Sequence, residues 1–359
     1  MTILAIETSC DDTCAAVLDA DGRIGANVIS SQEVHGRFGG VVPEIASRHH
    51  LEILDVVVAQ ALERAHTSLE QVELVAATQG PGLVGALLVG LSGAKALAAA
   101  RELPFAPVDH LQGHVAANFL IEREDGASRA AAGEAGERGP FEPPFVCLVA
   151  SGGHTLLAFV SEHDGFRLLG RTLDDAAGEA FDKGARMLGL GYPGGPALER
   201  LARDGDPRAF AFPGSAAERR RGGRGVRHRQ FADGLDFSFA GVKTALLYTL
   251  RELGEQGARE RAADLAASYQ AAIVESLAVR SEQALAHTGI ARLAVGGGVA
   301  ANGALRRRLR ELDVTLHVPS RALCTDNAAM IASAARFREP LAYPHYLSLD
   351  AYATGEARR

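Results

Sequence analysis

The stretch ILAIETSCDDTCAAVL, residues 3–18, is the part of the sequence that decides the fold. An apolar run at residues 3–6 leads into a polar segment, and a second apolar run begins at Cys14. This pattern predicts a buried strand, a tight polar turn and a second strand. A similar unit recurs at residues 145–160, where FVCLVA is followed by SGGH and TLLAFV. Two such units in one chain indicate a duplicated architecture.

Strand-like and helical segments alternate through the remainder of the chain. The apolar spacing predicts helices at residues 43–65, 83–100, 242–253, 262–287, 301–312 and 327–338, and further strands at 73–78 and 291–295. Alternation of this kind favours an α/β fold with a mostly parallel sheet.

Composition limits the classes of protein that this chain can belong to. Its 359 residues, 47% of them hydrophobic, are enough for two domains with separate cores. With 37 basic and 44 acidic residues, the net charge of -7 excludes a polycationic nucleic-acid-binding protein and restricts any RNA contact to a local patch. The 4 scattered cysteines predict reduced thiols in the cytosol. Neither a signal peptide nor a membrane span is expected, because the N-terminus lacks a basic segment and no apolar stretch is long enough.

His110 and His114 stand one helical turn apart in the segment HLQGH. On one face of a helix this spacing allows both imidazoles to bind a single metal ion. Leu111 occupies the place where a zinc protease carries its glutamate general base, so that chemistry is disfavoured. The best candidate for a third ligand is Asp326, at the start of the last predicted helix. Asp326 could instead serve only as the N-cap of that helix.

Glycine-rich turns follow three apolar segments, at residues 80–85, 151–154 and 296–298. Backbone N–H groups in such turns can bind phosphate or carboxylate, although tight-turn geometry alone also calls for glycine. The first turn matches G-x-G-x-x-G and is followed by Asp109, so a dinucleotide site is an alternative. Pro81 inside the loop and the absence of a regular strand-helix-strand succession argue against it.

Two charged segments complete the list of candidate features. The segment DDAAGEAFDK predicts a helix on which Asp175, Glu179 and Asp182 share one face, and a solvated acidic face is its simplest interpretation. The rigid, glycine-containing loop YPGGP follows at residues 192–196. Residues 219–229 carry six arginines and His228, a cluster that can contact phosphates or simply form a solvated insertion.

Taken together, ten motifs across residues 3–332 resemble, in order, the TsaD family of tRNA N6-adenosine threonylcarbamoyltransferases. They are ILAIETSCDDT, GGVVPEIASRHH, QGPGLVGALLVG, HLQGH, SGGHT, DDAAGEAFDK, YPGGP, DFSFAGVKTA, GGGVAAN and CTDNAAMIA. The resemblance implies an α/β, two-lobed actin-like ATPase (ASKHA) fold, with duplicated strand-turn-strand units and a cleft between the lobes.

The resemblance also implies a domain organisation. We expect an N-terminal lobe at residues 1–121, a polar insertion or linker at 122–143 and a C-terminal lobe at 144–324. The C-terminal lobe carries the basic insertion 215–230. Residues 325–359 are expected to return the last helix to the N-terminal lobe and to end in a tail.

The activity that the resemblance implies is transfer of a threonylcarbamoyl group from threonylcarbamoyl-AMP to the N6 amine of adenosine 37, with release of AMP. The tRNA substrates are those that read codons starting with A. The family's metal ligands, which hold iron or zinc, match His110, His114 and Asp326. Its substrate-binding positions, which hold the adenylate of the donor, match Val149, Ala150, Ser151, Gly152, Gly153, Asp182, Gly195 and Asn302.

The resemblance further implies a cytoplasmic protein that works with tRNA, the actin-like paralogue TsaB and the P-loop ATPase TsaE. No catalytic residue is identified. Glu7, Asp11 and Asp12 are candidates for a general base, and structural capping is an equal alternative for them. An actin-fold kinase or ATPase and a metallopeptidase remain as alternative functions, the second requiring a general base beside the metal that the sequence does not reveal.

Overall fold

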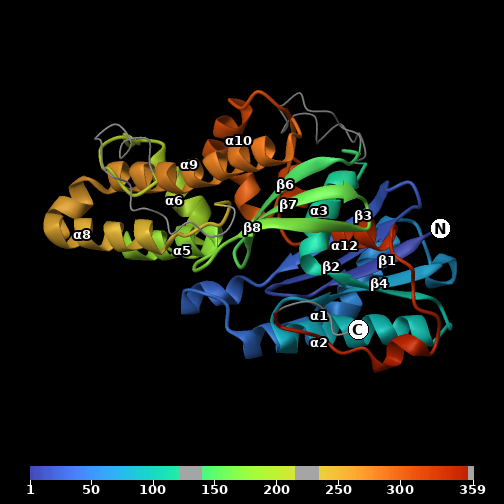
Figure 1. The fold of residues 1–359 in the computed structure, drawn as a ribbon. Helices are drawn as coiled ribbons and strands as arrows, with labels where there is room; N and C mark the ends of the chain where they lie inside the picture. The colour runs from blue at the N-terminus through green and yellow to red at the C-terminus, as the bar shows by residue number, and fades with distance from the viewer. Residues whose placement is uncertain (122–139, 215–233, 355–359) are drawn as a thin grey trace. The chain divides into compact units, whose positions relative to one another are not determined.

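The computed structural model describes residues 1–121, 140–214 and 234–354 (Figure 1). The chain divides into two compact units. Unit 1 comprises residues 1–143, 161–166 and 319–359, and unit 2 comprises residues 144–160 and 167–318. Most of the predicted polar insertion and the whole arginine cluster at residues 219–229 lie outside the described residues.

Unit 1 is built on a five-stranded sheet with the strand order β3-β2-β1-β4-β5. Its strands are β1 (Ile3–Glu7), β2 (Asp12–Leu18), β3 (Ile24–Ser31), β4 (Leu74–Gly80) and β5 (Phe105–Asp109). Strand β1 pairs antiparallel with β2 and parallel with β4, and β4 is parallel with β5. Both the strand-turn-strand prediction for residues 3–18 and the strand predicted near residues 73–78 are therefore confirmed.

Helices cover both faces of this sheet. They are α1 (Pro43–Arg64), α2 (Val84–Ala99), α3 (His110–Ala116), α11 (Arg321–Cys324) and α12 (Ala328–Ala335), with short 3-10 turns η1 (Glu33–Phe38), η2 (Leu69–Gln71), η3 (Ala117–Phe119) and η5 (His345–Ser348). Figure 1 shows α1 and α2 side by side against one face, with α3 and α12 on the other. Strands β1 and β4 are buried along their whole length because helices cover them from both sides.

Unit 2 has a second five-stranded sheet, with the order β10-β9-β6-β7-β8. Its strands are β6 (Phe145–Ala150), β7 (Thr155–Glu162), β8 (Gly165–Arg171), β9 (Arg292–Gly296) and β10 (Thr315–His317). Strand β6 pairs antiparallel with β7 and parallel with β9, and β9 is parallel with β10.

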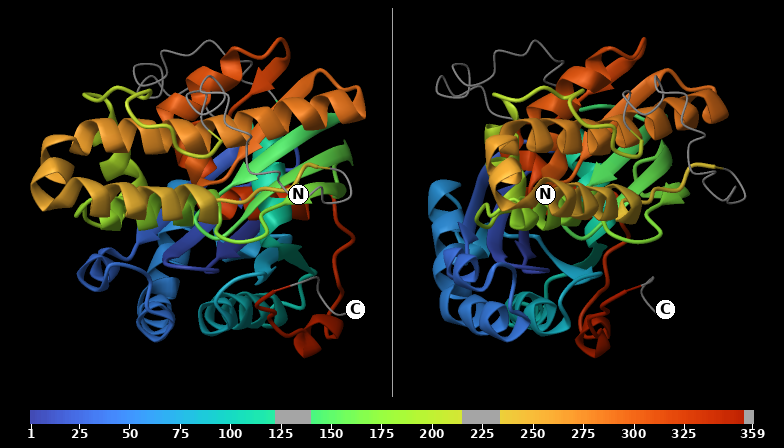
Figure 2. Two further views of the ribbon diagram at one scale, coloured as in Figure 1. Left: turned by 60° about the vertical axis from the view of Figure 1, so that its left-hand side comes forward. Right: turned by 90° about the vertical axis from the view of Figure 1, so that its left-hand side faces the viewer.

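The helices of unit 2 are α5 (Ala177–Met187), α6 (Gly194–Ala202), α8 (Ala240–Glu260), α9 (Ala262–Thr288) and α10 (Gly303–Arg310), with the 3-10 turn η4 (Gly298–Ala301) before α10. The two long helices α8 and α9 run beside each other, as both views of Figure 2 show. Helix α8 is interrupted at Gly254, which has a φ of 66° that only glycine adopts without strain.

The two sheets repeat one topology. In each, the first strand lies at the centre, two antiparallel strands follow on one side, and two parallel strands lie on the other. Thus β1 to β5 correspond in order to β6 to β10. The duplicated architecture predicted from residues 3–18 and 145–160 is present in the strand order of both units.

Among the described residues, every helix is either too short or too polar to cross a membrane.

Helix α2 packs against the loop after β1 at a very short distance. A Cβ atom on Gly90 would lie 2.2 Å from the Thr8 Oγ1 atom. Thr8 is 2% exposed, and its hydroxyl donates a hydrogen bond to the carbonyl of Ala86 one turn earlier on α2, at 2.9 Å. The glycine is therefore required by the close approach of the helix and not by its own backbone conformation.

We therefore expect Gly90→Ala to lower the free energy of unfolding by about 1 to 3 kcal/mol, because the new methyl group must displace a buried, hydrogen-bonded side chain. Gly257→Ala is the matched control, since the added Cβ would meet only Leu253 in helix α8 at ordinary contact distance. Gly257→Ala should raise the free energy of unfolding by up to about 1 kcal/mol. Urea unfolding of both variants measures the difference, and an unaltered midpoint for Gly90→Ala would contradict the packing argument.

Candidate functional site

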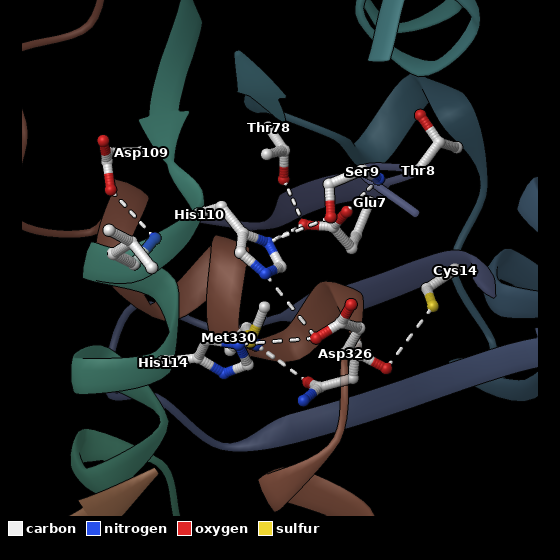
Figure 3. Close-up of polar contacts among 12 residues, drawn as sticks. Glu7, Thr8, Ser9, Cys14, Thr78, Asp109, His110, His114, Asp326 and Met330 are labelled. Carbon is white, nitrogen blue, oxygen red and sulfur yellow. Dashed lines mark hydrogen bonds and ion pairs between the residues drawn. The ribbon is translucent and has the colours of Figure 1, made fainter. Parts of the chain in front are cut away.

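Helix α3 and the segment before α12 bring two imidazoles and a carboxylate together. His110 begins α3 and His114 lies one turn later. Their Nε2 atoms are 3.6 Å and 3.4 Å from the Oδ1 atom of Asp326 (Figure 3). One ligand atom from each of the three residues lies within 4.8 Å of the others, which makes them a group able to hold one metal ion.

Asp326 does not cap the last helix. The cap of α12 is Asn327, whose side-chain oxygen accepts a hydrogen bond from the Met330 N–H at 3.0 Å. The capping alternative that the sequence left open for Asp326 is therefore wrong. Because its neighbour performs that task, the Asp326 carboxylate extends toward the two histidines.

His114 supplies the test of whether a metal fits. The side chain is fully buried, and neither ring nitrogen has a hydrogen-bond partner among the described residues. Leaving a buried polar atom without a partner costs about 1 to 3 kcal/mol, so such atoms are rare in folded proteins. A cation at the Nε2 atom would satisfy it. Two imidazoles and one carboxylate form a ligand set suited to zinc or iron, with positions left open for a substrate.

Glu7 orients the first histidine. The His110 Nδ1 atom lies 3.0 Å from the Glu7 Oε2 atom, which also accepts a hydrogen bond from the Thr78 hydroxyl at 2.5 Å. The other Glu7 oxygen accepts from the backbone N–H of Ser9. With Nδ1–H donated to this carboxylate, the lone pair of Nε2 is directed toward Asp326 and a metal.

The negative charge of Glu7 and the positive charge of His110 stabilise each other. Burial raises the pKa of Glu7, but the neighbouring His110 more than compensates, and the net pKa lies below the ordinary value. Burial likewise lowers the pKa of His110, whereas the carboxylates of Glu7 and Asp326 raise it to about 9. In the absence of a metal, His110 is therefore protonated at neutral pH. Metal binding would replace that proton at the Nε2 atom.

Two of the three candidates for a general base, Glu7 and Asp12, have different roles in the structure. Both oxygens of Glu7 are engaged in holding Ser9, Thr78 and His110, so Glu7 has a positioning role. Asp12 begins β2, and burial raises its pKa to about 7, with the Asp326 carboxylate adding to the effect. A carboxylate with this pKa is suited to accept a proton at neutral pH.

Asp109 does not have the role that the dinucleotide alternative requires. Its Oδ1 atom accepts hydrogen bonds from the N–H groups of Leu111 and Gln112 and thereby caps α3. Its Oδ2 atom accepts a hydrogen bond from the Tyr352 hydroxyl. Both oxygens are used to hold protein segments, so the geometry gives no support to a ribose-binding Asp109.

The other predicted residues belong to unit 2, and those at residues 149–153 lie at the end of β6. Strands β6 and β9 are parallel neighbours, with Val149 paired to Gly296. Gly297 has a φ of 85°, and a Cβ atom on it would lie 2.3 Å from the carbonyl oxygen of Ala150. The turn at residues 296–298 therefore lies directly against the end of β6, and glycine is required at residue 297 by both backbone conformation and space.

The turn at residues 151–154 is held by its own hydrogen bonds. The Ser151 N–H donates to the His154 carbonyl at 2.8 Å, and the Ser151 hydroxyl accepts from the His154 N–H at 3.1 Å. Gly152 and Gly153 are exposed, and a Cβ atom on either would meet nothing within 4 Å. Tight packing therefore does not explain these two glycines, and their backbone is accessible to a ligand.

Asp182 and Asn302 each hold the first turn of a helix through hydrogen bonds to its backbone N–H groups. The Asp182 Oδ1 atom accepts hydrogen bonds from the N–H groups of Gly194 and Gly195 at 2.8 Å and 3.2 Å. Asn302 accepts from the Leu305 N–H at 3.0 Å and caps α10. The structure thus assigns each side chain a local holding role, and direct contact of Asp182 and Asn302 with a substrate stays a prediction.

The prediction that Asp175, Glu179 and Asp182 share one acidic helix face is wrong. Helix α5 begins at Ala177, so Asp175 precedes it. The Asp175 carboxylate instead lies 2.7 Å from the Lys183 Nζ atom and 2.5 Å from the Lys243 Nζ atom. Sequence reasoning missed both lysines, because Lys243 comes from a distant helix and nothing in the spacing indicates the pairing.

Comparison with known proteins identifies first the class and then the family. The repeated sheet topology is that of the actin-like ATPase (ASKHA) fold. The HypF protein of T. kodakarensis has a TM-score of 0.57 over 93% of this chain and 47% of its own, at 14% identity. The activator of the 2-hydroxyisocaproyl-CoA dehydratase from Clostridium difficile, solved with bound ADPNP, has a TM-score of 0.51 over 94% of each chain, at 13% identity. At these identities the likeness shows the fold alone.

The chain belongs to the TsaD family, the tRNA N6-adenosine threonylcarbamoyltransferases, whose model matches residues 23–333. The Symbiobacterium thermophilum protein of that description is 48% identical over 355 residues, covering 97% of this chain and 95% of the relative. The Pelobacter propionicus protein is 45% identical over 364 residues, covering 100% and 98%. The family expected from the ten motifs is thereby confirmed.

The raised pKa of Asp12 predicts how the stability of the metal-free protein varies with pH. The folded-state pKa of about 7 exceeds the ordinary aspartate value of 3.8, so the folded protein binds the proton more tightly than the unfolded chain. Stability therefore falls as the pH rises through this window. Asp12→Asn should remove this dependence, and the free energy of unfolding that it gains over wild type should be about 2 to 3 kcal/mol larger near pH ~8 than near pH ~5.

Urea unfolding of metal-free protein at the two pH values measures this difference. Asp21→Asn is the matched control, because Asp21 lies exposed on the turn after β2. The free energy of unfolding of Asp21→Asn should change with pH as that of the wild type does. An equal effect of Asp12→Asn at both pH values would contradict the assigned pKa.

Proposed function

We propose that this protein transfers the threonylcarbamoyl group from threonylcarbamoyl-AMP to the N6 amine of adenosine 37 in tRNAs that read codons starting with A. The observation that carries the proposal is the buried group of His110, His114 and Asp326 in a chain of the TsaD family. The curated relatives are named for this modification of the adenosine N6 atom. The donor, the tRNA position and the codon class come from the family resemblance.

The reaction forms one bond and breaks one. The N6 nitrogen attacks the carbamoyl carbon, the bond from that carbon to the phosphate oxygen breaks, and AMP leaves with the electron pair. The N6 nitrogen loses one proton to a base. An exocyclic adenine amine is a weak nucleophile, whereas the mixed anhydride is an activated acyl donor, so the protein must chiefly position both groups and stabilise developing negative charge.

His110, His114 and Asp326 would hold one divalent metal ion, iron or zinc. When bound, such an ion polarises a carbonyl or phosphoryl oxygen as a Lewis acid. Glu7 keeps His110 in the required tautomer and orientation through the contact at Nδ1.

We assign the adenylate of the donor to the glycine turns of unit 2. The exposed backbone of Gly152 and Gly153 offers N–H groups to phosphate or carboxylate oxygens. Asp182, through its bonds to the N-terminus of α6, sets the position of Gly195. Among the acidic candidates, Asp12 is the best placed chemically to accept the N6 proton, since Glu7 is fully engaged.

From the family resemblance alone, we also propose a cytoplasmic location and assembly with TsaB and TsaE. Co-purification of the full chain with each partner is the direct test.

His114→Ala should abolish metal binding and transfer activity while the protein remains folded. His114 supplies one of the three ligand atoms, and two ligands bind a divalent ion far more weakly than three. The exposed His287, in the last turn of α9, provides the matched control as His287→Ala. Metal content measured by elemental analysis decides the assignment. Stoichiometric metal in His114→Ala would show that the ion is held elsewhere.

Asp182→Asn should weaken binding of a stable donor analogue by about 1 to 3 kcal/mol, the range for a lost hydrogen bond to a charged group. The amide oxygen can still accept from Gly194 and Gly195, so the loop is retained. Asp204→Asn, at an exposed position after α6, is the control. Calorimetry gives the affinity, and wild-type values for Asp182→Asn would remove this residue from the donor site.

A further inference from the structure

The C-terminal segment, residues 341–353, is anchored along strands β4 and β5 of unit 1. Leu341 exchanges backbone hydrogen bonds with Phe105 in β5, at 2.8 Å and 2.9 Å. Tyr346 is fully buried, and its ring centroid lies 5.2 Å from that of Phe105. The Lys95 ammonium donates to the carbonyl of Leu349 at 2.8 Å. These contacts bring the segment to the carboxyl ends of the two strands.

Tyr352 lies at the end of this segment, next to the residue that precedes the first metal ligand. Its N–H donates to the Gln79 carbonyl at 3.2 Å. Its hydroxyl oxygen is 2.7 Å from the Asp109 Oδ2 atom and 2.9 Å from the Gly80 carbonyl oxygen. The hydroxyl has one proton for these two acceptors, and the carboxylate is both nearer and charged, which makes it the stronger acceptor.

Asp109 transmits this contact to helix α3. While Oδ2 accepts from Tyr352, Oδ1 accepts from the N–H groups of Leu111 and Gln112 at 2.8 Å and 3.1 Å. His110, the first residue of the helix, lies in the chain between Asp109 and these two N–H groups. A carboxylate held at both oxygens fixes the orientation of the first helical turn more firmly than a cap that can rotate.

A second connection reaches the same histidine from the other side. The Gly82 N–H donates to the Ala353 carbonyl at 3.3 Å, and the Leu83 N–H donates to the Ser9 carbonyl at 2.8 Å. The Ser9 hydroxyl lies 3.2 Å from the His110 Nδ1 atom. The C-terminal segment therefore also contacts the loop that sets the position of Ser9.

We propose that Tyr352 is a positioning residue for the metal centre, acting through Asp109 on the first turn of α3. The proposal rests on the metal site assigned under the proposed function. Groups that hold metal ligands in place from behind contribute about 10- to 100-fold to metal affinity when their hydrogen bonds are direct. Tyr352 reaches the metal ligand only through Asp109, so we expect its effect on metal affinity to lie near the lower end of this range.

The first test uses metal-free protein, so that it does not depend on the metal site. Tyr352→Phe removes only the hydroxyl and keeps the ring. Hydrogen exchange at the backbone amides of Leu111 and Gln112 should become about tenfold faster, because their acceptor is no longer held. Tyr343→Phe, an exposed tyrosine of the same segment, should exchange at wild-type rates. Unchanged exchange in Tyr352→Phe would overturn the proposal.

The second test titrates the protein with Co²⁺ and follows its visible absorption, which reports ligand geometry. Tyr352→Phe should raise the dissociation constant about tenfold and alter the spectrum, whereas Tyr343→Phe should match wild type. Asp109→Ser keeps a good helix cap but removes the second oxygen. Adding Tyr352→Phe to that variant should then change affinity less than about twofold, because the route through Asp109 is already lost.

Independent, multiplying effects of the two substitutions would show that Tyr352 does not act through Asp109. A wild-type protein that binds no Co²⁺ would contradict the metal site itself, and the exchange rates of metal-free Tyr352→Phe would still decide the role of Tyr352.

Discussion

The buried carboxylate of Glu7 beside His110 is the interaction on which unit 1 depends. Glu7 ends β1, Thr78 lies in β4, and His110 follows β5 directly, so one carboxylate joins the carboxyl ends of three neighbouring parallel strands. Burying an ionised group is costly unless it is paired and hydrogen-bonded. All the donors around Glu7 are therefore required together, and they leave His110 with one nitrogen directed at the metal position.

The repeated topology places different chemistry at equivalent positions of the two units. In unit 1, the turn between the first two strands is polar and precedes the carboxylate of Asp12. In unit 2, the corresponding turn between β6 and β7 contains Gly152 and Gly153, whose backbone is exposed. Side chains at strand ends suit a metal ion and proton transfer, whereas bare backbone suits phosphate. The same sheet topology therefore presents side-chain carboxylates and imidazoles in unit 1 and exposed glycine backbone in unit 2.

The candidate metal site was predictable in part. The spacing of His110 and His114 follows from helical geometry, which places residues four apart on one face. The contribution of Asp326 rested on a motif, because a residue far along the chain reaches the site only through the packing of α12 against the sheet. The mistaken alternatives have different origins. Aspartate and asparagine are both good helix caps, so the sequence could not decide between Asp326 and Asn327. The pairing of Asp175 with Lys243 joins two distant segments, which local spacing does not reveal.

The sequence by itself determined the duplicated strand-turn-strand units, most of the longer helices and the family, because these depend on local periodicity and on motifs contiguous along the chain. It did not predict β3, β8 or β10, and it favoured a mostly parallel sheet where the structure has two mixed ones. Only the tertiary structure decided that Glu7 holds His110, that Asp109 caps α3 and does not bind ribose, and that Tyr352 lies against that cap. The physical reason is that the contacts of Glu7 with His110 and of Tyr352 with Asp109 form between segments distant in sequence. Their partners are chosen by strand order and by the demand that every buried polar group be satisfied.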